Sequence, residues 1–352
     1  MTESERDDQM KNKVVGILQV AATFIGTVVG AGFASGREII QFFTQYHSFG
    51  TIGAILSGVF MTWIGTKMMV YAKRLDAYSF NELLAALFGE RIGTVIQALL
   101  FFIVLGMTGV MLAGAGAVFG EQLGWSRQFG IVLALLIGIL FLVRGVRGLL
   151  FVNMLVVPLL VSFVLITFWT NKAGAQFFPE SGHIHWLFSA FNYSAFNLST
   201  ALVVLVPMAK EFKDEQVIRL GGILGGCGLA MILLMSHLMM LGKSDISLFE
   251  LPMAEMVRPL GTVMHAAFIC VIFGEILTTF VGNIFGLTRQ LHNVFPTLFT
   301  IRFAMLSLII CTFFIGQFGY ASLISTLYPL YGALCAVVFI YMCFVRLPEK
   351  KR

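Results

Sequence analysis

The chain has 352 residues, of which 58% are hydrophobic and 12% charged, and its formal net charge is +5. Soluble domains carry about 25% charged residues, so a soluble protein of this length would lack charge for its surface. The composition therefore excludes a soluble enzyme and a nucleic-acid-binding protein, and it predicts an integral membrane protein whose surroundings are the lipid bilayer. The five cysteines lie inside apolar runs without metal-ligand spacing, which predicts neither disulfides nor a metal site.

Ten apolar runs are long enough to cross a bilayer, which takes about 20 apolar residues. The predicted spans are 14–45, 50–72, 92–118, 128–144, 148–170, 185–208, 218–241, 260–286, 300–316 and 320–345. With a cytoplasmic N-terminus, most of the 23 Lys and Arg residues fall on the inner side, as the positive-inside rule requires. The outer side holds only Arg37, Arg127, Lys172, Lys243 and Arg258. The pattern predicts a multi-pass protein of the cell membrane with both termini in the cytoplasm.

The second half of the chain repeats the span pattern of the first. The first span is interrupted at Gly30-Ala31-Gly32, and the sixth carries a polar stretch from Asn192 to Asn197, which predicts a second interruption. Because each half holds five spans, the second half enters the membrane from the opposite side. Inverted repeats with interrupted helices are typical of secondary transporters, whose unwound segments line a polar cavity. The predicted organisation is an N-terminal tail (1–13), a first five-helix repeat (14–170), an external loop (171–184), a second repeat (185–345) and a C-terminal tail (346–352).

The break in the first span is the strongest candidate for a binding site. Four glycines within eleven residues weaken the helix there and let the backbone approach a ligand closely. Free amides at a broken helix suit an anionic group such as a carboxylate. The alternative is helix packing, since the glycines also form small-xxx-small pairs. The candidate substrate-binding residues here are Gly30, Ala31, Gly32, Phe33, Ala34, Ser35 and Gly36.

The polar residues of the sixth span are further candidates for substrate contacts. Asn192, Tyr193 and Asn197 carry amide and hydroxyl groups inside an apolar run. Such groups in a membrane form hydrogen bonds, either with a substrate or with a neighbouring helix. Both possibilities remain open at this point.

The eighth span carries Glu275 together with Thr278 and Thr279. A carboxyl group within a membrane span indicates a functional site, and the two threonines lie on the same helical face as this glutamate. Their hydroxyls, with carbonyls released by the break in the first span, are oxygen ligands suited to a small hard cation. The alternative is that each threonine bonds a carbonyl of its own helix.

Arg37 and Glu38 follow the break by one turn, toward the predicted outer side. They either form a gate or a proton-coupling element through ion pairs, or neutralise one another at the membrane interface.

The whole pattern resembles the leucine-transporter fold of the amino acid–polyamine–organocation superfamily: an all-α membrane protein with ten transmembrane helices, a five-plus-five inverted repeat, and interrupted helices 1 and 6. The run Gly-Ala-Gly-Phe-Ala-Ser-Gly-Arg-Glu at 30–38 resembles the bacterial YkvI-type membrane proteins. The resemblance implies a sodium site made by the carbonyls of Gly26, Val29 and Glu275 and the hydroxyls of Thr278 and Thr279. A second sodium site of the superfamily uses an asparagine where this chain has Phe33.

These observations predict a cation-coupled, sodium-dependent secondary transporter of a small organic solute, an amino acid or a related zwitterion, that works by alternating access. No cofactor is predicted beyond the coupling sodium ion. One alternative is a proton-coupled transporter that uses Glu275, and another is a non-transporting ligand sensor on the same fold. No catalytic motif of an enzyme is present, and the sequence makes no prediction of oligomeric state.

Overall fold

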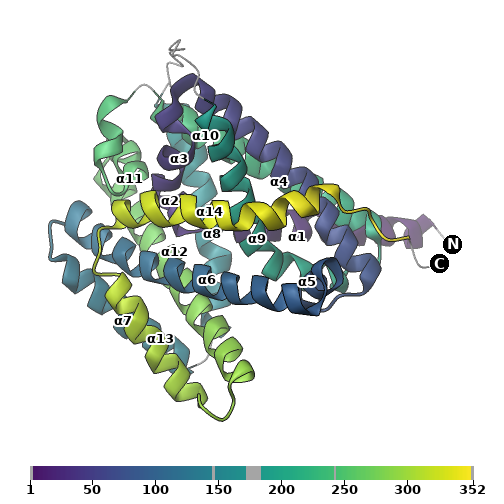
Figure 1. Cartoon of the computed structure of the whole chain (residues 1–352). Helices are drawn as coiled ribbons and strands as arrows, with labels where there is room; N and C mark the ends of the chain where they lie inside the picture. The colour runs from purple at the N-terminus through teal and green to yellow at the C-terminus, as the bar shows by residue number, and fades with distance from the viewer. Residues whose placement is uncertain (1–2, 145–146, 172–183, 242, 350–352) are drawn as a thin grey trace.

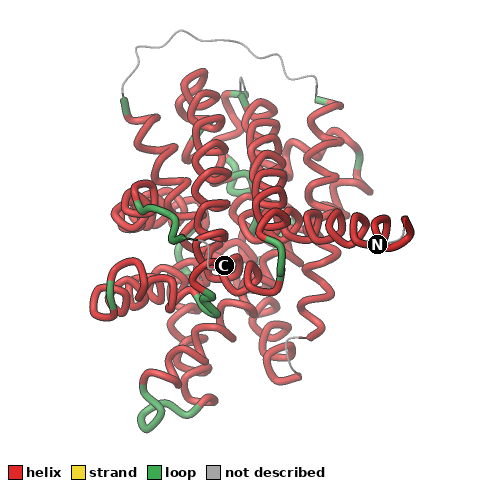
Figure 2. The backbone as a smooth tube through the Cα atoms, turned by 90° about the vertical axis from the view of Figure 1, so that its right-hand side faces the viewer, coloured by secondary structure: helices red, strands yellow, loops and turns green. Residues whose placement is uncertain are grey.

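The structure is a computed structural model that describes residues 3–144, 147–171, 184–241 and 243–349. Throughout these ranges the secondary structure is helical and no strand occurs. Figure 2 shows helices throughout the described residues, and Figure 1 shows both termini at the same end of the molecule. The predicted external loop lies almost wholly outside the described residues.

Ten of the described helices correspond to the ten predicted spans. They are α1 (Glu3–Val28), α4 (His47–Leu75), α6 (Glu90–Ala117), α7 (Arg127–Arg144), α8 (Arg147–Thr170), α9 (His185–Glu211), α10 (Glu215–Met240), α12 (Thr262–Val294), α13 (Ile301–Ile315) and α14 (Tyr320–Phe344). Within the described part, six helical stretches are long and apolar enough to cross a membrane, and four shorter apolar helices complete the set. Helix α1 already begins within the predicted N-terminal tail.

The first predicted span is divided into three helices, as its glycines predict. Helix α1 ends at Val28, α2 covers Ala31–Ser35 and α3 covers Arg37–Phe42. Gly30 has an extended backbone, and Gly36 adopts the left-handed region with φ of 80°. Only glycine adopts this region without strain, so Gly36 permits the sharp turn between α2 and α3. The predicted interruption of the first span is confirmed.

The predicted interruption of the sixth span is wrong, because α9 is continuous from His185 to Glu211. Its polar side chains bond carbonyls one turn earlier in the same helix. The Ser194 hydroxyl donates to the carbonyl of Ala190 at 2.9 Å, and the Asn197 amide donates to that of Tyr193 at 3.1 Å. Side chains that are satisfied in this way are compatible with an intact helix. No glycine or proline occurs between Asn192 and Asn197 to break the helix there, and Pro207 lies farther along α9 without ending it.

Short helices connect the long ones. Helix α5 (Phe80–Phe88) lies between α4 and α6, and a π-helical turn, η2 (Val118–Gln122), extends α6. Between α10 and α12 the chain forms η3 (Ser244–Leu248), α11 (Pro252–Val257) and η4 (Arg258–Leu260). We call this connection the 244–260 segment. A 3-10 turn, η1 (Thr44–Tyr46), joins α3 to α4.

The long helices pack around the divided first span. Helix α10 packs along α4 and α1, and α9 packs along α4 and α14 and also contacts α1. Helix α12 packs against α6, α8 and α13, and it also contacts α2. Figure 1 shows α14 and α6 crossing the molecule side by side, with α7 and α13 projecting from it. The break between α1 and α2 therefore lies in the interior, where backbone without helical hydrogen bonds must line a cavity.

Candidate functional site

A cavity of about 1130 Å³ lies at this break, between α1, α2, α9 and α12. Its inner part is lined by Gly30, Ala31 and Gly32, and its outer part by the exposed Asn81 of α5 and Asn293 of α12. Helix α5 lies toward the end of the molecule that holds both termini (Figure 1). The cavity thus leads from the helix break toward that end.

Two buried carboxyl groups face the cavity. Glu38 from α3 is 5% exposed and Glu275 from α12 is 3% exposed, and both line it. One carboxylate oxygen of each, Oε2, has no hydrogen-bond partner among the described residues. No Lys, Arg or His belongs to the described lining, and no described ion pair includes either glutamate. The cavity is therefore acidic.

Glu38 reaches the break because α3 turns back on α2 at Gly36. Its carboxyl group occupies the space where Gly32 has no side chain: a Cβ atom on Gly32 would overlap the Oε1 atom and would lie 2.6 Å from the Cδ atom of Glu38. The chain thus places a carboxyl group of its own against the backbone that the sequence predicts to bind a substrate carboxylate.

The predicted substrate residues of the first span separate into two groups. Gly30, Ala31 and Gly32 line the cavity, whereas Phe33 to Gly36 do not. The Ser35 hydroxyl donates to the carbonyl of Gly32 at 2.8 Å and accepts from the Tyr320 hydroxyl at 2.8 Å. These contacts fix α2 against α14, so the second group supports the break.

The predicted residues of the sixth span separate as well. Asn197 lines the cavity, but Asn192 and Tyr193 do not. The Tyr193 ring is fully buried, with ring centroids 5.3 Å from Phe42 and 4.8 Å from Phe43. Its neighbour Asn192 packs against Gly332, at which a Cβ atom would lie 2.6 Å from the Cβ atom of Asn192. In this structure both residues pack against neighbouring helices, and the Tyr193 hydroxyl has no hydrogen-bond partner among the described residues.

Tyr328 of α14 also lines the cavity, which sequence reasoning missed. Its side chain is fully buried and its hydroxyl has no partner among the described residues. The available signal was a tyrosine followed by Pro329 in the middle of an apolar span.

Four of the five predicted sodium ligands line the cavity. These are Gly26, Glu275, Thr278 and Thr279, whereas Val29 is not in the lining. The Thr278 hydroxyl donates to the carbonyl of Glu275 at 3.1 Å. Thr278 therefore bonds its own helix, as the alternative stated. Its oxygen still has lone pairs that can face a cation.

The opposite side of the break is covered by the 244–260 segment. Arg37 donates from one guanidinium nitrogen to the carbonyls of Ser247 at 2.6 Å and Phe249 at 3.1 Å. The Glu121 carboxylate of η2 accepts the backbone N–H groups of Glu250 at 2.6 Å and Leu251 at 2.9 Å. Arg37 and its neighbour Glu38 thus point to different places, one to this segment and the other to the cavity.

Comparison with known proteins identifies the family. No protein-family model matches the chain. The uncharacterized membrane protein YkvI of Bacillus subtilis is 40% identical over 321 residues, which cover 89% of this chain and 91% of YkvI. The chain belongs to the YkvI family. A second protein of the same organism, the uncharacterized YyaD, is 24% identical over 92% of this chain and 94% of its own length.

Solved structures show that this YkvI-family chain shares the fold of known transporters. An inward-facing conformation of Mhp1 matches 93% of the chain and 76% of Mhp1, with a TM-score of 0.68 and 14% identity. A second structure of Mhp1, a nucleobase-cation-symport-1 family transporter, is in a closed conformation with bromovinylhydantoin bound. It matches 91% of the chain and 74% of Mhp1, with a TM-score of 0.58 and 12% identity. A manganese transporter of Eremococcus coleocola matches 95% of the chain and 79% of its own length, with a TM-score of 0.62 and 13% identity. The leucine-transporter-like fold is confirmed.

Proposed function

We propose that this YkvI-family protein is a cation-coupled secondary transporter of a small organic solute that bears an amino group, an amino acid or a related zwitterion. The observation that carries the proposal is the pair of buried carboxyl groups, Glu38 and Glu275, in a cavity without a cationic side chain. An ionised carboxylate that is buried without a counter-charge costs several kcal/mol. A cationic substrate group, a coupling cation or a proton would each remove this cost.

The two carboxyl groups suit different positive charges. Glu38 lies against the helix break, where backbone amides and carbonyls are also within the lining. This position suits the ammonium group of a substrate. Glu275 lies with the hydroxyls of Thr278 and Thr279, and with Gly26 across the cavity. This set of hard oxygen ligands suits sodium.

The shape of the cavity supports alternating access. It leads toward the end that holds both termini, which the positive-inside rule predicts to be cytoplasmic. On the opposite side, Arg37 and Glu121 hold the 244–260 segment over the break. The higher TM-score against inward-facing Mhp1 than against its closed conformation agrees with a state that is open on one side.

Proton coupling through Glu275 is the second candidate. The unpartnered Oε2 atom of this residue and the position of Val29 outside the cavity lining favour it. Protonation would neutralise the buried carboxyl group without a complete sodium site.

The test is the melting temperature of the purified protein against a panel of L-amino acids and primary amines, in sodium and in choline buffer. A ligand that binds only the folded state stabilises it by about 2.7 kcal/mol at a hundredfold excess over Kd. We expect one chemical class of ligand to stabilise the protein, and to do so more strongly in sodium.

Two variants make this experiment specific for the cation site. Replacement of Thr278 and Thr279 together by alanine should remove the sodium dependence. Thr288→Ala should keep it, because Thr288 is a buried threonine of the same helix that lies outside the cavity. A ligand effect that ignores sodium but depends on pH, and that Glu275→Gln abolishes, would establish proton coupling. No stabilisation by any amine or amino acid would refute the substrate class.

A further inference from the structure

A second cavity lies on the outside of the helix bundle, along the seam where α4 packs against α10. It is a groove of about 840 Å³, and it is separate from the central cavity because the two share no lining residue. Helices α4 and α10 approach each other closely at its base, where a Cβ atom on Gly58 would overlap Ala230. Its apolar side chains include Ile55, Val59, Trp63, Ile223, Met231 and Leu234.

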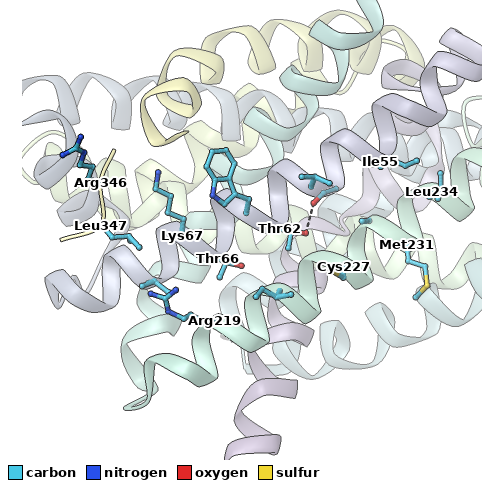
Figure 3. A pocket seen from close by; sticks show the side chains of 16 residues that line it. Ile55, Thr62, Thr66, Lys67, Arg219, Cys227, Met231, Leu234, Arg346 and Leu347 are labelled. Atoms are coloured by element: carbon cyan, nitrogen blue, oxygen red, sulfur yellow. Dashed lines mark hydrogen bonds between the residues drawn. The ribbon is translucent and has the colours of Figure 1, made fainter. Parts of the chain in front are cut away.

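One end of the groove is basic. Figure 3 shows Lys67, Arg219 and Arg346 gathered at one end, with Ile55, Met231 and Leu234 at the other. This charge distribution is that of an amphipathic site with a cationic end and an apolar channel.

The positive charge at this end is not balanced by nearby acids. Lys67 donates to the carbonyls of Met342 at 3.0 Å and Cys343 at 2.8 Å, which are neutral groups. Arg219 pairs with Glu215 at 2.7 Å, but this carboxylate is shared with Arg74 at 3.0 Å.

Arg346 is exposed, and no ion pair to it is found among the described residues. The cationic end of the groove therefore carries an excess of positive charge.

A buried polar atom lies beside this basic end. The Thr66 hydroxyl lines the groove and has no hydrogen-bond partner within the described part of the chain. The hydroxyl oxygen is enclosed by the protein and faces α10, since a Cβ atom on Gly222 would lie 2.5 Å from it, so it belongs to the seam between the two helices.

The groove has the length of one lipid chain. From Ile55 to Lys67 the helix rises about 18 Å, and one leaflet contributes about 15 Å of hydrocarbon to a bilayer. The basic end lies near the residues that follow α14, at the end of the molecule that holds both termini (Figure 1). Anionic headgroups bind basic pockets between membrane helices on the cytoplasmic side.

We propose that this groove binds one anionic phospholipid of the cytoplasmic leaflet. Its acyl chain follows the seam between α4 and α10, and its phosphate lies among Lys67, Arg219 and Arg346. A zwitterionic lipid carries a cationic group in its headgroup, so its interaction with these basic residues is less favourable. Because α10 packs against both α4 and α1, the lipid lies along helices that surround the divided span.

Trp63 provides a direct probe of the occupant. It lines the groove, its side chain is half-exposed, and its ring centroid lies 5.5 Å from the Lys67 ammonium. In a variant that keeps only this tryptophan, with Trp125, Trp169 and Trp186 replaced by phenylalanine, bromine atoms on a bound acyl chain quench its fluorescence.

The experiment titrates brominated phosphatidylglycerol, or brominated phosphatidylcholine, into phosphatidylcholine nanodiscs that hold this variant. We expect phosphatidylglycerol to quench at a lower mole fraction. Arg346→Gln should weaken its apparent affinity about fivefold, the contribution of one basic residue near an anionic lipid. Arg302→Gln is the matched control, because Arg302 is an exposed arginine of α13 outside the groove, and it should leave the preference unchanged.

Equal quenching by the two lipids would show an ordinary annular position and overturn the proposal. A preference that survives both Arg346→Gln and Arg219→Gln would also overturn it. Quenching by neither lipid, with the protein dimeric, would make the seam an interface between copies and contradict the proposal. Native mass spectrometry gives a second readout that does not depend on the tryptophan replacements. We expect the unmodified chain to retain one phosphatidylglycerol molecule, and we expect the Arg346→Gln variant to lose it.

Discussion

Gly32 and Glu38 depend on each other within the break of the first span. The carboxyl group of Glu38 occupies space that any side chain at position 32 would fill. The glycine pattern predicted that backbone would be accessible here. It did not predict that a carboxyl group of the same chain would reach it, because that contact depends on the turn at Gly36 and on the packing of α3.

Gly32→Ala should therefore destabilise the protein and weaken ligand binding. The added methyl group must displace the Glu38 carboxyl, and overpacking of this kind costs about 1–3 kcal/mol. The effect is measured as a change in melting temperature and in ligand-induced stabilisation. For the melting temperature without ligand, Gly30→Ala is the matched control, since a Cβ atom there would meet nothing within 4 Å.

A double-mutant cycle shows whether the Glu38 contact is the cause. In a Glu38→Ala background the cost of Gly32→Ala should largely disappear, because the overlapping group is gone. Equal costs in the two backgrounds would show that the strain arises elsewhere in α2.

Helices α1 and α9 show which sequence signals are reliable at the scale of elements. Gly30 and Gly36 have extended and left-handed backbones, so the glycine-rich break follows from the sequence. The polar residues of α9 predicted a break that the structure does not have, because Ser194 and Asn197 bond carbonyls of their own helix. Polar composition alone does not distinguish a broken helix from an intact one whose side chains satisfy themselves.

The places of Arg37 and Tyr328 did not follow from the sequence either. Each is determined by an element far away in the chain: Arg37 by the 244–260 segment and Tyr328 by the packing of α14 on α9. The composition of a single span carries no information on such contacts.

The 244–260 segment should loosen when Glu121 loses its carboxylate. Glu121→Ala leaves the backbone N–H groups of Glu250 and Leu251 without their acceptor, and hydrogen bonds to charged groups are worth about 1.5–3 kcal/mol each. Hydrogen–deuterium exchange at these two amides should become faster. Arg258→Gln serves as the control, because Arg258 pairs with Glu255 inside the segment. Unchanged exchange in Glu121→Ala would show that other contacts hold the segment.

For the molecule as a whole, the positions of the cavity and of the charges predict one orientation. A cysteine at Asn293, which is exposed and lines the outer part of the cavity, should react with a membrane-impermeant maleimide from the cytoplasmic side. The five native cysteines are replaced beforehand. A cysteine at Leu248, which is 79% exposed on the 244–260 segment, should react only from the outside. Labelling of both positions from one side would contradict the predicted topology.

The fold and the family leave one question for the whole molecule: whether binding is followed by movement of the ligand across the membrane. In the proposed function a cation or proton neutralises the carboxyl groups of the cavity, and a secondary transporter couples the movement of this charge to the passage of its substrate. A ligand sensor on the same fold would bind and hold the ligand.

The most direct measurement is uptake of the radiolabelled stabilising ligand into proteoliposomes under an inward sodium gradient, with a proton gradient as the second arm. We predict accumulation above the equilibrium level under one of the two gradients, and its loss in Glu275→Gln and when that gradient is collapsed. Binding of the ligand without accumulation under either gradient would contradict the proposed function.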